Sequence, residues 1–261
     1  MGRIAQAFAR GRPAFIPFVM AGDPSLEASA AFVRALAAAG ADVIELGVPF
    51  SDPIADGPTN QRAAERALAA GTTPAAVLEL VAGLRAGGLE TPLVLFSYLN
   101  PLLALGDYAP RAAAAGADGL LVVDLPPEEA LEHEAACAEA GLDRIYLAAP
   151  SSGPERLARL AAVGSGFVYY VSRYGVTGAR KVLPSGLGEQ VRRVRVAAGR
   201  PVAVGFGIAT PEQAAAVAAV ADGVVVGSAL VEVIAAHGAA ATAPLGALAT
   251  RLARAVHGAP R

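Results

Sequence analysis

A glutamate and two aspartates, Glu45, Asp52 and Asp56, stand in one short segment, ELGVPFSDPIADGP, which covers residues 45–58. Glu45 lies inside an apolar run, and Asp56 lies in the turn of prolines and glycine that follows it. Burial raises the pKa of a carboxyl group and so suits it to proton transfer near neutral pH. The pair therefore indicates general acid–base catalysis. Two simpler interpretations stand beside this one: Glu45 as a strand-end carboxylate bonded to backbone, and Asp56 as an ordinary loop residue.

The second chemical feature is a set of glycines in the last third of the chain, which leave backbone N–H groups accessible to a ligand. Four glycines follow three consecutive apolar runs there: Gly178, Gly205, Gly207 and Gly227. Glycine lets backbone N–H groups approach an anion without a Cβ in the way. Ser228 adds a hydroxyl, and the helix predicted to begin there directs its first N–H groups at the same place. The pattern indicates a phosphate site, although each glycine alone is equally typical of a tight turn.

Scarce residue types exclude other mechanisms. The only lysine, Lys181, lies in a glycine-rich loop, whereas a Schiff-base aldolase needs a desolvated lysine on a strand. The histidines fall in helical or terminal segments and not at strand ends, where metal ligands would be expected: His133, His237 and His257. No GxGxxG follows the first strand, so the fingerprint of a dinucleotide-binding fold is missing. We therefore predict no metal or cofactor in this chain, and acid–base chemistry on a small phosphorylated molecule.

Eight short runs of β-branched and aromatic residues recur along the chain and are typical of strands. They cover residues 15–20, 42–48, 92–98, 119–124, 144–149, 166–172, 201–206 and 223–227. Segments rich in alanine and leucine, with helical spacing, separate them and include 25–39, 74–86, 127–140, 154–163 and 211–221. Proline close to serine, threonine or aspartate marks the start of several of these helices.

This alternation of strands and helices predicts parallel β/α units. Eight units in a chain of this length favour an α/β fold of the (β/α)8 TIM-barrel type with extra short helices, as one domain over residues 1–261. An open, doubly wound sheet is the alternative. Val43, Glu45 and Gly47 share one face of their strand, so we expect Glu45 to point into the mouth of the barrel, where such folds do their chemistry.

Composition narrows the class of protein further. The residues are 54% hydrophobic and 17% charged, with a net charge of −2 and no Lys/Arg clusters, which argues against nucleic acid as a partner. A long uncharged stretch near the end, residues 233–250, contains Pro244 and two glycines, so no membrane span is predicted. The first residues lack an apolar h-region, so we predict no secretory signal and a cytoplasmic protein. The single cysteine, Cys137, is predicted to pack inside a helix layer.

Six segments in order resemble the tryptophan synthase alpha chain family: PFVMAGDP, ELGVPFSDPIADGP, VVDLPPEE, SRYGVTGAR, GFGI and VVGSALV. They span nearly the whole chain, and the second of them is highly specific. The resemblance implies a (β/α)8 barrel that cleaves indole-3-glycerol phosphate to indole and D-glyceraldehyde 3-phosphate in tryptophan biosynthesis. It also implies that pyridoxal phosphate is bound only by a partner, the beta subunit, in an α2β2 complex.

The resemblance carries site residues over to this sequence position by position. It implies that Glu45 and Asp56 are the catalytic pair. The substrate contacts that it implies form an indole pocket, an active-site tyrosine and a phosphate cradle: Phe18, Tyr98, Phe206, Tyr169, Thr177, Gly178, Gly207, Gly227 and Ser228. The residues that it places toward the beta subunit are Pro53, Asp56, Asp124 and Pro126. By pattern alone, Tyr169 is more often a core residue than a ligand, and Asp124 is equally a cap for a helix near Pro127.

The chain departs from the family at few positions. Met20 and Asn60 stand where other residues are common, and we expect Asn60 to affect how its loop packs on the partner. The implied reaction needs an electron sink, and the indole ring can serve once C3 is protonated. Our hypothesis is that Glu45 moves protons at C3 and the adjacent hydroxyl, while Asp56 holds the indole N–H and stabilises positive charge.

Two other interpretations stay open. The first is another phosphosugar barrel, such as an epimerase or indole-glycerol-phosphate synthase, and the missing strand-end histidine and lysine argue against it. The second is a catalytically silent barrel that binds and activates a partner, and the intact carboxylate pair argues against that.

Overall fold

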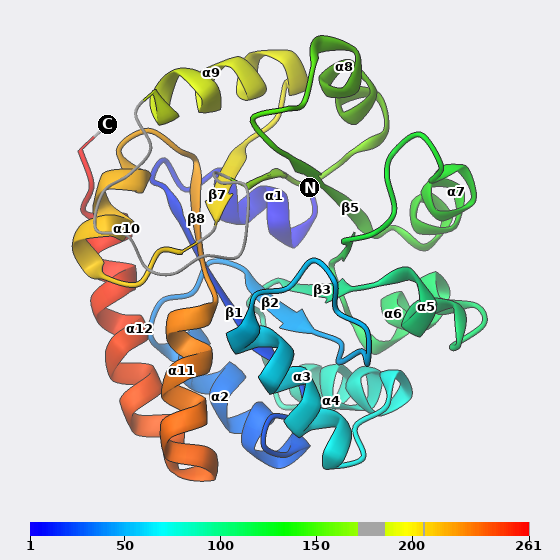
Figure 1. Cartoon of the computed structure of the whole chain (residues 1–261), viewed down its shortest axis with the longest axis vertical. Coiled ribbons are helices and arrows are strands. Elements are labelled where there is room, and N and C mark those ends of the chain that lie inside the picture. The colour runs from blue at the N-terminus through cyan, green and yellow to red at the C-terminus, as the bar shows by residue number, and fades with distance from the viewer. Residues whose placement is uncertain (172–185, 206, 261) are drawn as a thin grey trace.

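In the computed structural model, eight parallel strands close into one barrel in chain order, and helices surround it (Figure 1). The structure describes residues 1–171, 186–205 and 207–260. The strands are β1 (Ala14–Met20), β2 (Ile44–Gly47), β3 (Leu93–Ser97), β4 (Gly119–Val122), β5 (Asp143–Ala148), β6 (Val168–Val171), β7 (Val202–Gly205) and β8 (Gly223–Val226). Because β8 pairs with β1, the sheet has no open edge. The predicted (β/α)8 architecture is confirmed, and the open-sheet alternative is wrong. The assignment of residues 1–261 to one domain stays a prediction.

The helices of the described chain lie between the strands and after the last one. They are α1 (Arg3–Phe8), α2 (Leu26–Ala38), α3 (Pro58–Ala69), α4 (Pro74–Ala86), α5 (Leu99–Leu103), α6 (Tyr108–Ala115), α7 (Leu131–Ala140), α8 (Pro154–Val163), α9 (Leu187–Ala198), α10 (Pro211–Ala218), α11 (Ser228–His237), the 3₁₀ helix η1 (Gly238–Ala241) and α12 (Thr242–His257).

Side-chain caps explain why several helices begin where the sequence predicts. Ser25 accepts a hydrogen bond from the N–H of Ala28 at the start of α2, and Thr73 does the same for Ala76 at the start of α4. Thr210 forms a capping box with Gln213 at the start of α10. Each cap satisfies an N–H that the helix itself leaves unpaired, and is typically worth about 1 kcal/mol.

One predicted helix start is wrong. The sequence suggested a helix over 127–140, but α7 begins only at Leu131, and the preceding residues form turns. This segment is tied instead to α8: Arg156 pairs with Glu128 at 2.9 Å, and Arg159 donates to the carbonyl of Pro127. These contacts hold the chain in a turn that a helix starting at Pro127 would have to break.

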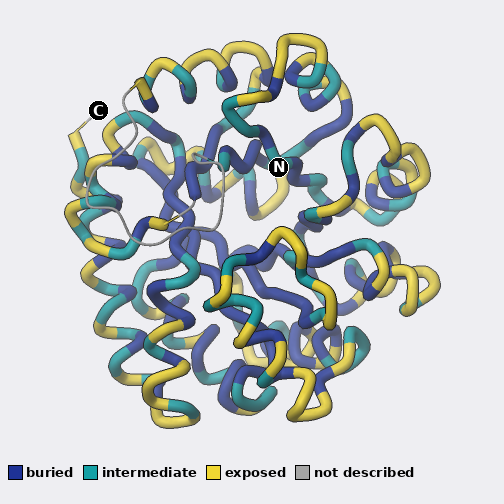
Figure 2. Tube along the Cα trace, in the orientation of Figure 1, coloured by how far each residue is buried: buried dark blue, intermediate teal, exposed yellow. Residues whose placement is uncertain are grey.

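Side chains of the barrel wall alternate between two layers. Inward-facing residues, such as Ile16 and Val94, form an inner core that α1 joins through Ile4 and Ala7. Outward-facing residues of the same strands pack under the helices in a second, larger core. Buried segments accordingly lie at the centre of the molecule, and exposed ones on the outer turns of the helices (Figure 2). The inner core therefore fills the barrel up to the level where the strands end.

Three aspartates stabilise the rim of the barrel at which the strands begin, opposite the rim at which the strands end. Each precedes an even-numbered strand and accepts a backbone N–H from the strand before it: Asp42 from Phe15, Asp118 from Leu93 and Asp222 from Val202. Each also binds an arginine, and the three arginines are Arg12, Arg85 and Arg195. All three follow an alanine, a repeat that sequence reasoning missed although the sequence shows it. These bonds fix neighbouring strands in register.

One stretch of the described chain, Ser228–His257, is long and apolar enough to cross a membrane by length and composition. It is not one continuous helix. Gly238, with φ 55° and ψ −137°, breaks it between α11 and η1, and α12 then packs against α2 and α10. Its apolar residues thus cover the outside of the barrel wall.

We expect Asp42→Ala to lower the free energy of unfolding by about 3 kcal/mol. The substitution leaves the N–H of Phe15 without its acceptor and removes the ion-pair partner of Arg10 and Arg12. Burial raises the pKa of Asp42, but hydrogen bonds from His257 and Phe15 and the charge of Arg12 more than offset it, so the pKa is lowered. The stabilisation is therefore present above the unfolded pKa of about 4 and is lost as the pH falls through the folded value.

Denaturant unfolding at pH 7 and below pH 4 measures both effects. The matched control is Asp107→Ala, at an exposed aspartate that makes no side-chain cap for α6. A loss of stability no larger than that of the control would contradict the assigned role.

Candidate active site

Glu45 lies on the inner face of β2, opposite Phe18 of β1 and Val94 of β3. Its neighbours Ile44 and Leu46 face the outer core, so the predicted inward orientation is confirmed. Glu45 is only 1% exposed, and neither carboxyl oxygen has a hydrogen-bond partner among the described residues. The interpretation of Glu45 as a backbone-bonded strand end is therefore wrong. Desolvation raises its pKa to about 8, so the group is protonated at neutral pH and can donate a proton.

Asp56 lies in the loop between β2 and α3 and is 7% exposed. Its Oδ2 accepts a hydrogen bond of 3.0 Å from the hydroxyl of Tyr98, which in turn accepts one of 3.0 Å from the N–H of Ala55. Burial raises the pKa of Asp56 above its usual value, and the hydrogen bond from Tyr98 offsets only part of this rise. Asp56 is thus a fixed, inward-facing carboxylate and not an ordinary loop residue.

The first turn of α3 holds the backbone of this loop. Gln61 donates from Nε2 to the carbonyl of Asp56 at 2.9 Å, and the N–H of Asp56 donates to Pro53 at 3.0 Å. Sequence reasoning missed Gln61. The signal available for it was its place in the first turn of a helix that starts directly after the loop, at Pro58.

Aromatic rings form one wall of the site. The rings of Phe18 and Phe96 meet edge to face, with centroids 5.3 Å apart, and those of Phe50 and Tyr98 lie at the same distance. Gly47 makes room for them, because a Cβ there would lie 2.8 Å from the Phe18 ring. Phe50 and Phe96 were missed, although the alternation of β3 puts Phe96 on the inner face with Val94. The wall offers a flat apolar surface of the kind that an aromatic ring fits.

Tyr169 of β6 lies near enough to the two carboxyl groups to interact with them electrostatically. Its side chain is buried and belongs to the inner core, as its pattern-based interpretation had it. Burial raises its pKa well above the usual value, and the nearby charges of Glu45 and Asp56 raise it further. Gly205 of β7 provides the space, because a Cβ there would lie 2.2 Å from the Tyr169 hydroxyl oxygen. Gly205, predicted as part of a phosphate cradle, thus has a steric role beside the tyrosine.

The predicted phosphate cradle is partly described. Gly227 is the N-cap of α11 and Ser228 its first residue, so the first backbone N–H groups of this helix lie at the carboxyl end of β8. Gly207 has a φ of 72°, which favours glycine, and a Cβ there would meet open space. Thr177, Gly178 and Phe206 lie outside the described residues. The described part can bind an anion through backbone N–H groups and one hydroxyl.

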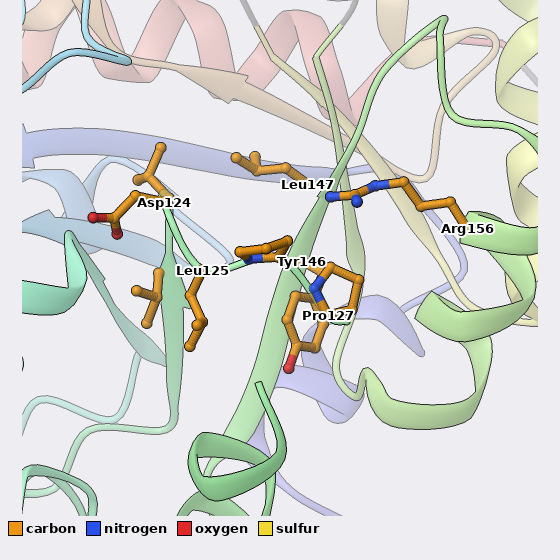
Figure 3. A pocket seen from close by; sticks show the side chains of 9 residues that line it. Asp124, Leu125, Pro127, Tyr146, Leu147 and Arg156 are labelled. Atoms are coloured by element: carbon orange, nitrogen blue, oxygen red, sulfur yellow. The ribbon is translucent and has the colours of Figure 1, made fainter. Parts of the chain in front are cut away.

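A cavity of about 280 Å³ opens where β4 and β5 end, lined by Asp124, Pro126 and Arg156 among others (Figure 3). The Arg156 side chain extends toward Leu147 in this view. Asp124 does not cap the helix near Pro127, since its Oδ1 accepts the N–H of Leu99 at the start of α5, at 2.8 Å. Asp124 therefore links the loop after β4 to the start of α5, whose N-cap is Tyr98.

Cys137 is buried in α7, as predicted, beside His133. His133 Nδ1 lies 2.9 Å from the hydroxyl of Tyr108, and burial lowers its pKa to about 4, so the ring is neutral. Burial also raises the pKa of the Cys137 thiol to about 12. Across the part of the chain that the structure describes, no group of three or more His, Cys, Asp or Glu side chains could hold a metal ion.

Comparison with known proteins agrees with this geometry. A family model described as tryptophan synthase alpha chain matches residues 4–256. The tryptophan synthase alpha chain of Novosphingobium aromaticivorans is 50% identical over 261 residues, which cover 99% of this chain and 98% of that protein. That of Citrifermentans bemidjiense is 55% identical, with 89% of each chain covered.

Solved structures place the fold in the same family. Tryptophan synthase subunit alpha from Legionella pneumophila has a TM-score of 0.91 at 38% identity, over 99% of both chains. Mycobacterium tuberculosis tryptophan synthase gives 0.90 at 43% identity over 98% of both, and a chain of the Pyrococcus furiosus tryptophan synthase complex gives 0.86 at 38% over 92% of this chain and 98% of that one. The family match over nearly the whole chain, together with these neighbours, leads to one conclusion: this chain belongs to the tryptophan synthase alpha chain family.

Proposed function

We propose that this chain cleaves indole-3-glycerol phosphate to indole and D-glyceraldehyde 3-phosphate, with Glu45 and Asp56 as the catalytic pair. The reaction is that of the family to which the chain belongs. The observation that supports these roles is the contrast between two buried carboxyl groups. Glu45 has no hydrogen-bond partner among the described residues and is protonated at neutral pH, whereas Asp56 accepts a hydrogen bond from Tyr98 that offsets part of the rise in pKa caused by burial.

Glu45 supplies the proton that starts the cleavage. Transfer of this proton to C3 of the indole ring gives an indoleninium cation. The bond between C3 and the glycerol chain then breaks, its electron pair returns to the ring, and indole regains its aromaticity. The hydroxyl on the departing carbon loses its proton to the Glu45 carboxylate and becomes the aldehyde, so the catalyst is regenerated and all atoms balance. Acid–base catalysis of this kind contributes about 10²–10⁴-fold to the rate.

Asp56 stabilises the indoleninium cation that forms before the carbon–carbon bond breaks. Its free lone pairs can accept the indole N–H, whose hydrogen becomes more acidic as positive charge develops on the ring. Tyr98 and the backbone of Ala55 fix the carboxylate before the substrate arrives, so little reorganisation is needed during the reaction. The aromatic wall of Phe18 and Phe96 holds the ring in place.

The phosphate group anchors the other end of the substrate. In this proposal it lies at the start of α11, against Gly227 and Ser228, with Gly207 beside it. Thr177, Gly178 and Phe206 keep the substrate-binding roles that the family resemblance implies. The binding energy of the phosphate orients the reacting bond toward Glu45. Contacts remote from the reacting atoms increase the rate in this way.

Membership of the family implies a beta subunit as partner, and we place its docking surface on the rim around the active site. Among the described residues, three large apolar side chains are exposed on this rim, on the loop after β2, at the end of α5 and at the start of α7: Ile54, Leu103 and Leu131. Pro53, Asp124 and Pro126 lie on the same loops. Asp56 is buried, so in the complex it would lie behind this surface and couple to it through Ile54 and Pro53.

We further propose an α2β2 complex in the cytoplasm, in which pyridoxal phosphate belongs to the beta subunit and this chain works without a cofactor. The alternatives of a sugar-phosphate epimerase and of a silent partner-activating barrel have no observation in their favour.

We expect Glu45→Gln to lower kcat for indole release by about 10²–10⁴-fold, because the amide cannot donate and retrieve the proton. In the unsubstituted protein, kcat/KM should decline above about pH 8 as Glu45 ionises. Indole release from indole-3-glycerol phosphate under steady-state conditions measures both, with Glu139→Gln at an exposed position of α7 as the control.

A stability measurement shows whether Glu45→Gln loses activity because it lacks the proton donor or because it misfolds. The raised pKa of Glu45 means that the folded protein holds a proton that the unfolded chain releases above about pH 4.5, so stability falls as the pH rises toward 8. Glu45→Gln lacks this loss and should be more stable than the unsubstituted protein at pH 8. Near-normal indole release by this variant would refute the assignment.

We expect Ile54→Glu to weaken binding of the beta subunit at least tenfold, because it places a charge in the apolar centre of the proposed surface. Val196→Glu is a matched control: Val196 is 78% exposed on α9, compared with 84% for Ile54. Isothermal titration of the purified subunits measures both affinities. Equal affinities for the two variants would place the interface elsewhere.

A further inference from the structure

A bidentate ion pair joins the loop after β1 to α3. Arg66 of α3 donates from Nε to Oδ1 of Asp23 at 2.8 Å and from Nη2 to Oδ2 at 2.7 Å. The Asp23 side chain is 1% exposed and that of Arg66 is 36% exposed. Two parallel N–H···O bonds permit one orientation of the guanidinium relative to the carboxylate. The pair therefore fixes α3, at Arg66, against the loop that follows β1.

The rest of the buried face of α3 is made of small side chains. Ala63, Ala64 and Ala67 are buried and pack with Phe18 and Val231. An alanine side chain buries less apolar area than a leucine or a phenylalanine, so a face of alanines restrains a helix only weakly against sliding or tilting. The ion pair supplies a directional contact that this packing lacks.

The loop after β1 also contacts the other segment that flanks residues 48–57, the catalytic loop that carries Asp56. The N–H of Ala21 donates to the carbonyl of Gly47, the last residue of β2, at 2.9 Å. Gly22 has a φ of 84°, and a Cβ there would lie 1.9 Å from Oγ1 of Thr72, just beyond the end of α3. The loop after β1 thus contacts the chain on both sides of the catalytic loop.

The position of Asp56 depends directly on that of α3. Asp56 lies two residues before Pro58, the first residue of the helix, and Gln61 of the first turn donates to its backbone carbonyl at 2.9 Å. A shift of α3 is therefore passed to the Asp56 backbone and to the carboxylate that Tyr98 contacts. Misplacement of a catalytic group by about 1 Å can lower the rate by about 10²-fold.

We propose that Asp23 and Arg66 form a positioning pair, which acts through α3 to hold Asp56 where its carboxylate can accept the indole N–H. The inference rests on the proposed role of Asp56. Neither member of the pair contacts the substrate in this proposal. Loss of the pair should therefore lower turnover more than substrate binding, because the phosphate contacts at the start of α11 remain.

The kinetic test compares two arginine-to-lysine variants. Arg66→Lys keeps the positive charge, but an ammonium cannot form the two parallel bonds. Arg195→Lys is the matched control, because Arg195 is 39% exposed and bonds to Asp222 at 2.7 Å on the opposite rim. We expect kcat for indole release to fall roughly tenfold in Arg66→Lys with a smaller change in KM, measured well below the Tm, and to stay within about twofold in Arg195→Lys.

Amide hydrogen exchange provides a readout that does not depend on activity. The N–H of Asp56 donates to the carbonyl of Pro53, and that of Ala55 donates to the hydroxyl of Tyr98, both at 3.0 Å. Opening of the catalytic loop breaks both bonds, so these two amides report its position. We expect both to exchange roughly tenfold faster in Arg66→Lys than in the unsubstituted protein or in Arg195→Lys.

A second variant tests the pair from its other side. Asp23→Asn removes the charge with little change of shape and should alter kcat and amide exchange in the same direction as Arg66→Lys. Unchanged exchange of both amides would overturn the inference, as would equal kcat values for Arg66→Lys and Arg195→Lys, which would mean that the pair only stabilises the fold. Absence of indole release from the unsubstituted protein would refute the proposed function, and amide exchange would still decide the role of the pair.

Discussion

Glu45, a carboxyl group that has no hydrogen-bond partner within the described parts of the chain, lies inside the barrel wall, and much of the structure serves to keep it there. Water is kept from the group by the inner core below it and the aromatic rings beside it. Desolvation of this kind favours the neutral form, and here it moves the pKa to about 8. A barrel strand is suited to hold such a group, because its bonds to two neighbouring strands fix the direction of the side chain.

The two rims of the barrel treat acidic residues in opposite ways. Where the strands begin, Asp42, Asp118 and Asp222 are each satisfied by a backbone N–H and an arginine. Where the strands end, Glu45 has no hydrogen-bond partner among the residues that the structure describes, and the hydrogen bonds of Asp56 offset only part of the effect of its burial. Satisfied carboxylates stabilise the register of the sheet, whereas under-satisfied ones destabilise it and have perturbed pKa values. This division matches the general separation of stability and chemistry between the two ends of such barrels.

Asp56 depends on contacts that Glu45 does not need. It lies on a loop, so its place is determined by Tyr98 after β3 and by Gln61 on α3. The same loop exposes Ile54 on its outer side. A partner that covers Ile54 would therefore act on a segment whose inner side carries a catalytic group. This arrangement offers a direct physical route from docking to the geometry of the active site.

The sequence by itself determined the features that local periodicity and local bonds control. Alternation along β2 predicted that Glu45 points inward, and serine or threonine before a helical run predicted the starts of α2, α4 and α10. These follow from the geometry of one strand or one turn, so neighbouring residues suffice. The predicted start of α7 was wrong because arginines of α8, which are distant in the sequence, bind the segment before α7 and keep it in a turn.

Only the tertiary structure decided which distant groups meet. Tyr98 reaches Asp56, Asp124 reaches the start of α5, and Gly205 leaves space for Tyr169. Each of these contacts joins residues on different strands or on the loops that follow them. Parallel strands are separated in the chain by whole helices, so no local pattern records which side chains the closed sheet brings together at its rim.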